Sequence, residues 1–323
     1  MAAAVAVALG VYTVALLLER HGVLSVQRAG DVLLYQYASQ AVAHGAIPYR
    51  NLYFEYPPGA LAAILPPEPA ANYALAFKIE MAVLGAAMLP IAAVVLRDRR
   101  RLLPALLAIA VAPGLVGSVF VNRYDVFPAL LMLAALVLLV EDRPTAAWIL
   151  LGLGTVVKIY PAAAAPVFAI WVFRTAGWQA LKRGLQAFVA TIVVVVAPFA
   201  ALGPGGLRFS FVIQLTRHLQ TESLGSGFLL VADRLGLYRA HIGDGKPGSL
   251  DLFGTLPELV AALSLVAVVA ALLWIAWELW RGPLDRERAI VATAAAITVY
   301  VAFGKVLSPQ YLVWLVPLGP LVG

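Results

Sequence analysis

The chain has 323 residues, of which 63% are hydrophobic and only 12% are charged, and its net charge is +6. Soluble domains carry about 25% charged residues, so this composition excludes an ordinary soluble enzyme or a disordered chain and favours an all-α polytopic membrane protein. The absence of cysteine excludes disulfides, thiolate catalysis and cysteine-ligated metal sites. The net positive charge fits basic cytoplasmic loops and does not by itself indicate nucleic acid as a partner.

Apolar stretches recur along the whole chain and, at roughly 20 residues a span, predict about ten membrane helices in a single integral domain, residues 1–323. The first, residues 2–18, has no basic residue before it and runs directly into Glu19 and Arg20, which favours a retained helix over a cleaved signal peptide. The other predicted spans are 72–96, 102–120, 126–140, 145–157, 159–173, 185–202, 254–279, 289–303 and 310–322.

Basic clusters at residues 97–101, 174–183 and 281–288 follow the second, sixth and eighth predicted spans. An alternating chain places all three on one side, which the excess of Lys and Arg identifies as cytoplasmic. The long loops 19–71 and 203–253 then lie on the extracytoplasmic side, together with the short connections 121–125, near 158 and 304–309. Because long loops in a compact bundle are usually functional, we expect the active site on that face.

The first long loop contains an amphipathic stretch from Asp31 to His44, which predicts a helix lying along the outer membrane surface. Asp31 stands at its head, where an aspartate can cap the free backbone N–H groups of a helix. A carboxylate at the membrane surface could equally act as a general base that takes a proton from an attacking hydroxyl. Both interpretations stay open from the residues alone.

Cationic side chains on the same predicted face suggest an anion site. Several cations that converge near a membrane surface suit the phosphate of a lipid headgroup, while the alternative is ordinary contact with anionic lipid or snorkelling to the interface. The candidates for donor phosphate binding are Lys158, Arg217, His218 and Lys305.

Five segments of the chain carry distinctive motifs. The first loop has Asp31 at the head of a helix, then Gly-x-x-Pro-Tyr and Phe-x-Tyr-Pro-Pro within residues 30–58. The other segments are Asn122-Arg-Tyr-Asp125, Lys158-Ile-Tyr-Pro161, residues 217–223 and residues 305–311. Together these segments resemble glycosyltransferase family 87, whose members have the GT-C fold and use polyprenyl-phosphate-linked sugars.

This resemblance implies a GT-C-like bundle and an inverting transferase that moves a sugar, often mannose, from a polyprenyl-phosphate donor to a lipid or glycan acceptor. It implies that Asp31 is the general base. Candidate sugar or acceptor contacts are Glu55, Tyr56, Asp125 and Gln310. A transporter or flippase for an anionic or lipid-linked solute is the alternative from another class, and a GT-C-like scaffold without catalysis is the third.

The sequence specifies no metal site and no definite cofactor. The four histidines are too scattered for a zinc site, and phosphate-binding or dinucleotide-binding motifs are absent. A divalent metal stays possible, because Asp31, Glu55 and Asp125 could bind Mg²⁺ or Mn²⁺ if they converged.

Overall fold

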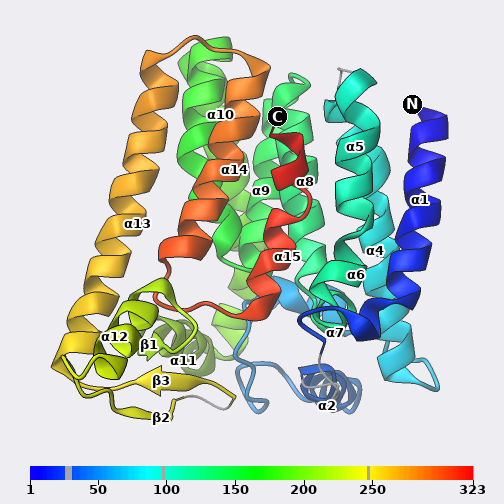
Figure 1. Cartoon of the computed structure of the whole chain (residues 1–323). Coiled ribbons are helices and arrows are strands. Elements are labelled where there is room, and N and C mark those ends of the chain that lie inside the picture. Colours follow the sequence, from blue (N-terminus) through cyan, green and yellow to red (C-terminus); the bar gives the residue numbers. More distant parts are fainter. Residues whose placement is uncertain (26–30, 97–98, 246–247, 323) are drawn as a thin grey trace.

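The computed structural model describes residues 1–25, 31–96, 99–245 and 248–322. The chain is mostly helical, and its longer helices run side by side between two ends of the molecule (Figure 1). These helices are α1 (Ala2–Leu17), α4 (Tyr73–Val95), α5 (Arg99–Ala110), α8 (Val126–Val140), α9 (Pro144–Val157), α10 (Ala165–Leu202), α13 (Thr255–Arg281) and α14 (Arg286–Phe303).

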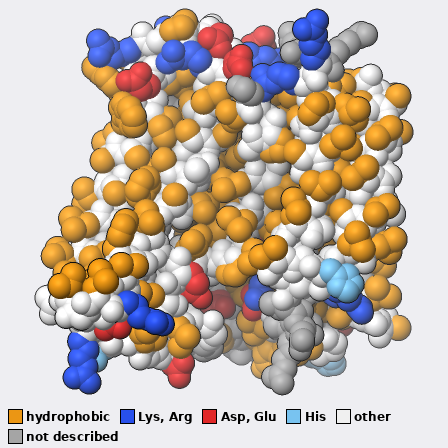
Figure 2. Space-filling view, viewed as in Figure 1, with side chains coloured by type: hydrophobic (Ala, Val, Ile, Leu, Met, Phe, Trp, Pro, Cys, Tyr) orange, Lys and Arg blue, Asp and Glu red, His pale blue; other side chains and the backbone are white. Residues whose placement is uncertain are grey.

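Three helical segments are long and apolar enough to cross a membrane, namely Tyr73–Val95, Tyr160–Leu202 and Thr255–Arg281. The first and third correspond to predicted spans, and α8 and α9 match the shorter predicted spans 126–140 and 145–157 almost residue for residue. Hydrophobic side chains cover the middle of the visible face, while charged side chains gather at its two ends (Figure 2). This distribution is that of a protein embedded in a membrane.

Helix α10 is two helical arms joined at Gly177, whose φ of 77° is open to glycine but costly for other residues. Phe168 and Phe188 are 20 residues apart, which is about 30 Å along a straight helix. Their ring centroids nevertheless lie 5.9 and 5.6 Å from that of Trp148 on α9. The chain therefore turns back at Gly177, as the separate predicted spans 159–173 and 185–202 require.

Two predicted spans are broken into shorter pieces. Residues 102–120 divide into α5, α6 (Ala112–Val116) and α7 (Val119–Asn122), because Pro113 and Gly117 interrupt the helix. The last predicted span, 310–322, forms only η4 (Pro309–Tyr311), α15 (Leu312–Leu315) and η5 (Gly319–Leu321). Pro317, Gly319 and Pro320 prevent a continuous helix there.

The described residues of the three basic clusters lie together at one end of the bundle. Arg101 Nη1 is 3.2 Å from Glu287 Oε1, and Arg174 Nη1 donates to the Gly282 carbonyl at 2.9 Å. The N-terminus and the start of α5 are at this same end, at the top of Figure 1. The shared position of the clusters agrees with the predicted alternation of the chain.

The opposite end carries the two long connections. The first contains η1 (Glu19–His21), the predicted amphipathic helix α2 (Asp31–Ala43), η2 (Pro58–Ala60) and α3 (Leu61–Ile64). The second, predicted as a loop, contains α11 (Pro204–Leu215), α12 (Leu224–Arg234) and an antiparallel sheet of order β1-β3-β2. Its strands are β1 (Leu219–Gln220), β2 (Ile242–Asp244) and β3 (Leu250–Leu252), too short to show an alternating pattern.

Candidate functional site

Asp31 lies in the first turn of α2 and forms an ion pair with Arg123, its Oδ2 being 2.7 Å from Arg123 Nη1. Arg123 adopts an extended backbone just after α7, so it reaches α2 from the short connection before α8. The Tyr35 hydroxyl, one helical turn after Asp31, also donates to Oδ2 at 3.5 Å. The partners of this carboxylate are therefore side chains, and the pair fixes its orientation without burying it.

An aromatic cluster surrounds the Asp31–Arg123 pair. The ring centroids of Tyr35, Tyr56 and Tyr124 lie 5.3–5.7 Å from one another in edge-to-face arrangements. Burial, together with the nearby negative charge of Asp31, raises the pKa of the Tyr35 and Tyr56 hydroxyls well above the usual value. Both hydroxyls therefore stay protonated and act as hydrogen-bond donors near the carboxylate.

A second ion pair lies on the other side of Tyr124. Oδ1 of the buried Asp125 accepts from Lys158 Nζ and from Trp314 Nε1, each at 2.6 Å. The Lys158 ammonium also lies 4.9 Å from the ring centroid of Tyr124 and 5.3 Å from that of Trp314. Lys158 ends α9 with an extended backbone, and the following Tyr-Pro turn directs the chain into η3 (Tyr160–Ala164).

Two further cations, Arg217 and Lys305, lie close to each other beyond this pair. Lys305 Nζ donates to the Leu215 carbonyl at 2.7 Å. Partial burial and the positive charge of Arg217 both lower the pKa of Lys305. The positive charge of Arg217 also acts electrostatically on the hydroxyl of Tyr311. The ring centroid of Tyr311 lies 5.6 Å from Lys158 Nζ. Neither cation is ion-paired with a carboxylate in the part of the chain that the structure describes.

The predicted residues therefore form one continuous polar path, with two exceptions. It runs from Asp31 through the hydroxyl of Tyr35 and the rings of Tyr56 and Tyr124 to the Lys158 pair, and Lys158 also lies over the ring of Tyr311. Arg217 and Lys305 lie near this end of the path, since the charge of Arg217 acts on both Tyr311 and Lys305. His218 is the first exception, because its ring packs against Phe253 at 4.7 Å beside the small sheet. Gln310 is the second: it is half-buried in η4, and within the described part of the chain its side chain forms no hydrogen bond or ion pair.

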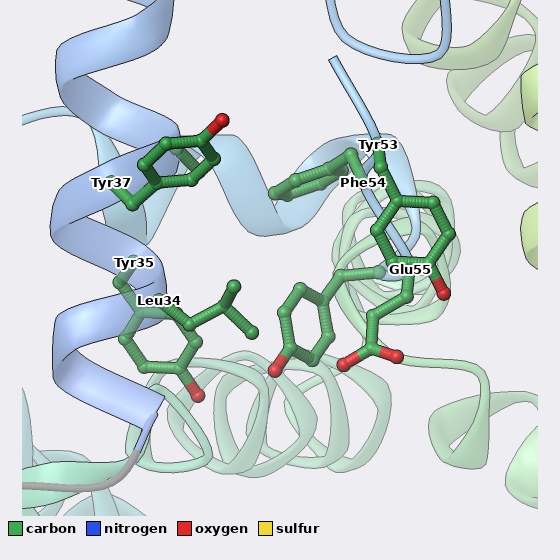
Figure 3. Close-up of a pocket in the computed structure, with 8 residues that line it drawn as sticks. Leu34, Tyr35, Tyr37, Tyr53, Phe54 and Glu55 are labelled. Carbon is green, nitrogen blue, oxygen red and sulfur yellow. The ribbon is translucent and has the colours of Figure 1, made fainter. Parts of the chain in front are cut away.

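Glu55 and Tyr56 line a pocket between α2 and residues 53–56. The pocket adjoins Asp31 through Tyr35, which lines it as well (Figure 3). A metal held by Asp31, Glu55 and Asp125 requires these three carboxylates to converge. Within the described ranges, no three or more His, Cys, Asp or Glu side chains are grouped to hold an ion, so this hypothesis gains no support there.

Several residues of the site were not singled out as site residues by the sequence analysis, notably Arg123, Tyr35, Tyr124 and Trp314. The segment Asn122-Arg-Tyr-Asp125 carried a signal, since it is one of the matched family segments. What the sequence could not supply is the pairing. Asp31 and Arg123 are 92 positions apart, and 189 positions separate Asp125 from Trp314.

Comparison with known proteins gives the family. Residues 53–309, more than half of the chain, match the profile of glycosyltransferase family 87. The chain belongs to this family. The family match includes Arg123, Asp125, Lys158, Arg217 and Lys305, and α2 with Asp31 precedes it. No curated protein matches the sequence.

The fold resembles that of a solved membrane glycosyltransferase structure. ArnT from Cupriavidus metallidurans, in a structure bound to undecaprenyl phosphate, matches with a TM-score of 0.59 and 17% identity over 99% of this chain. The oligosaccharyltransferase of Archaeoglobus fulgidus, tethered to an acceptor peptide, matches with a TM-score of 0.48 and 13% identity over 98% of this chain. The family 87 chain spans 58% of the ArnT chain and 49% of the oligosaccharyltransferase chain.

Proposed function

We propose that this family 87 protein is a membrane glycosyltransferase that moves a sugar from a polyprenyl-phosphate donor to a hydroxyl of a lipid or glycan acceptor. The observation that carries the proposal is the polar path from an oriented, partly exposed carboxylate, Asp31, toward two cations, Arg217 and Lys305, that pair with no carboxylate among the described residues. A glycosyl transfer needs both ends of such a path, a base for the acceptor and positive charge for the departing phosphate.

Asp31 acts in this proposal as the general base. Its carboxylate takes the proton of the acceptor hydroxyl while the hydroxyl oxygen forms a bond to the anomeric carbon. The bond between the anomeric carbon and the phosphate oxygen breaks, and its electron pair leaves with polyprenyl phosphate. Attack opposite to the leaving group inverts the anomeric carbon. Arg123 contributes by holding the Asp31 carboxylate in one orientation, which favours an attack geometry set in advance.

The donor phosphate is bound by Arg217 and Lys305 in this proposal. Two neighbouring positive charges repel each other, and an anionic ligand between them relieves that repulsion. Lys158 and His218 were predicted for the same phosphate. The pairing of Lys158 with Asp125 and the contact of His218 with Phe253 favour supporting roles for both, unless the donor displaces these contacts.

The finer features of the proposal follow from the family resemblance and the charge distribution. The proposed sugar is mannose. The proposed contacts to the sugar or the acceptor are Glu55, Tyr56 and Gln310. Asp125 is proposed to support the site through Lys158. The end of the molecule that carries α2 is proposed to face away from the cytoplasm, because the basic clusters lie at the opposite end.

The experiment is transfer by the purified chain in lipid vesicles, with radiolabelled polyprenyl-phosphate mannose as donor and a membrane lipid extract as acceptor source. We expect the label to move into an acceptor fraction, and Asp31→Asn to abolish this movement while donor binding persists. Movement of the donor lipid across the vesicle without transfer would instead indicate a flippase. Neither transfer nor movement, with donor binding intact, would contradict the enzyme and indicate a scaffold.

A further inference from the structure

Helix α12, in the second long connection, presents a stripe of apolar side chains that no described part of the protein covers. The side chains of the stripe are between 45% and 69% exposed, and they are Leu224, Phe228, Val231 and Leu235. At 3.6 residues per turn these positions lie within about 60° of one another around the helix axis. The other side of α12 is buried, because Leu229 packs against β1 and β3. A contiguous exposed stripe of this kind indicates a contact surface for an apolar partner.

The packing of α12 on α13 gives the depth of this stripe in the membrane. Gly225 lies so close to α13 that a Cβ there would be 2.6 Å from Val260 Cγ1 and 3.4 Å from Ser264 Oγ. Near the other end of α13, the exposed Trp277 ring lies 5.1 Å from the Arg281 guanidinium, an arrangement typical of a membrane edge. At 1.5 Å per residue, Val260 and Ser264 are about 20–26 Å from Trp277 along the helix. The hydrocarbon core is about 30 Å thick, so α12 begins at the level of its opposite boundary.

The stripe also continues the surface that α13 turns toward lipid. Helix α13 is long and apolar enough to cross a membrane, and Leu256, Leu259 and Leu263 are exposed along its first half. Figure 2 shows hydrophobic side chains extending from the middle of the molecule to its lower left, where Figure 1 places α12 and the start of α13. The lipid that covers this part of α13 therefore also reaches α12.

Two arginines stand where the stripe ends. Arg234 is the last residue of α12 and Arg239 follows shortly after it; both are exposed, and neither forms an ion pair with a carboxylate among the described residues. Helices that lie in a membrane interface combine an apolar face with Lys or Arg beside it, because the phosphates of the lipid headgroups accept their hydrogen bonds. The charges thus complement a lipid surface.

We infer that α12 is inserted into the lipid leaflet at this end of the bundle, with its stripe among the acyl chains and Arg234 and Arg239 at the level of the headgroup phosphates. The second connection is then anchored in the membrane and is not a solvent-exposed loop. The anchor bears on the site, since α12 packs against β1 and the Gln220 amide of β1 donates to the Lys305 carbonyl at 3.0 Å. It holds this strand and the Lys305 segment at the height of the headgroups.

Spin labels test the insertion, because the chain has no native cysteine to interfere. Phe228→Cys and Val231→Cys are each labelled with a nitroxide in vesicles of phosphatidylcholine and phosphatidylglycerol. Collisions of each label with O₂, which concentrates in lipid, and with a nickel chelate, which stays in water, are measured by EPR. The reference is Leu263→Cys, an exposed position on α13 at the level of Gly225. We expect the ratio of O₂ to nickel collisions at both α12 positions to be close to that at the reference.

Two further labels calibrate the scale within the same connection. Asp244 is exposed on β2, which lies farther from the helix bundle than α12 (Figure 1), so a label in Asp244→Cys should collide mainly with the nickel chelate. A label in Arg239→Cys should give an intermediate ratio, as expected at the headgroups. All the labelled positions on α12 and β2 are exposed, and a thermal melt of each variant checks that the fold is kept.

Two results would overturn the inference. A ratio at Phe228→Cys and Val231→Cys equal to that at Asp244→Cys would place the stripe in water. Few collisions with either reagent would show that protein, such as a second copy of the chain, covers it. The measurement uses no donor and no acceptor. A chain that transfers no sugar but gives the lipid ratio at α12 would therefore retain the anchor and lose only the transferase.

Discussion

Two ion pairs meet at a single short segment, and they are built differently. Arg123 and Asp125 are separated only by Tyr124, yet Arg123 reaches outward to Asp31 while Asp125 faces inward to Lys158. The Asp31 side chain is 32% exposed and that of Asp125 is 1% exposed. The rings of Trp314, Tyr124 and Tyr311 close the inner pair, whereas the outer pair borders the pocket beside α2.

The difference separates a carboxylate that can meet a substrate from one that holds the protein together. The outer pair leaves its carboxylate accessible, so a new hydrogen bond with an acceptor hydroxyl replaces water and costs little. The inner pair ties the connection before α8, the end of α9 and the segment after α14 to one point. In the proposed function, the same residue types therefore support chemistry in one place and architecture in the other.

Breaking the inner pair should have the largest effect on stability. Asp125→Ala leaves the largely buried Lys158 ammonium without its counter-charge, and loss of one partner from a buried pair costs about 3–5 kcal/mol. Asp31→Ala removes a partly exposed partner and should cost about 1 kcal/mol or less. Thermal unfolding of both variants in detergent measures the contrast. Equal losses of stability would show that the two pairs do not differ in this way.

The adjacent residues Arg217 and His218 give a second contrast, in donor affinity. Arg217→Gln removes the charged contact that we propose to the phosphate and should weaken donor binding by about 1.5–3 kcal/mol, roughly 10- to 100-fold. His218→Gln should change donor affinity much less, because its ring faces Phe253. Titration with fluorescent polyprenyl phosphate compares the donor affinities of the two variants. A larger loss of affinity in His218→Gln would show that His218, and not Arg217, binds the phosphate.

A smaller effect is expected from pH. Burial and the charge of Arg217 lower the pKa of Lys305, so Lys305 loses its positive charge at a lower pH than an ordinary lysine. As pH rises through this lowered value, donor affinity should fall, and below it the affinity should be constant. The arginine in the Lys305→Arg variant keeps its positive charge, so the donor affinity of this variant should persist to higher pH than that of the wild type. Identical pH profiles of donor binding for the two proteins would exclude Lys305 as the titrating contact.

Local patterns allowed much of the helical fold to be predicted. The amphipathic spacing after Asp31 predicts α2, and the structure confirms it as Asp31–Ala43. The apolar run of residues 126–140 gives α8 with the same bounds, because a polar connection marks each end. The last predicted span differs, since hydropathy counts apolar residues and gives no weight to the breaks at Pro317 and Pro320.

The pairings within the site could not be predicted in the same way. Residue type identified Lys158 and Asp125 as chemically important, but their shared ion pair depends on how α8 and α9 pack. The sheet in residues 219–252 was missed because strands of two or three residues carry no periodicity. Long-range contacts of this kind follow from the packing of the whole chain and have no local signature.

A comparison of Asp31→Asn with Asp125→Asn tests most directly whether the two carboxylates divide chemistry and architecture between them. Both variants remove one negative charge with little change of shape. Sugar transfer at saturating donor and the melting temperature are measured for each. We expect Asp31→Asn to lose about 100-fold or more of the transfer rate with an unchanged melting temperature. Asp125→Asn should lower the melting temperature and keep most of the transfer rate below it. Full transfer by Asp31→Asn would contradict the account and move the base elsewhere.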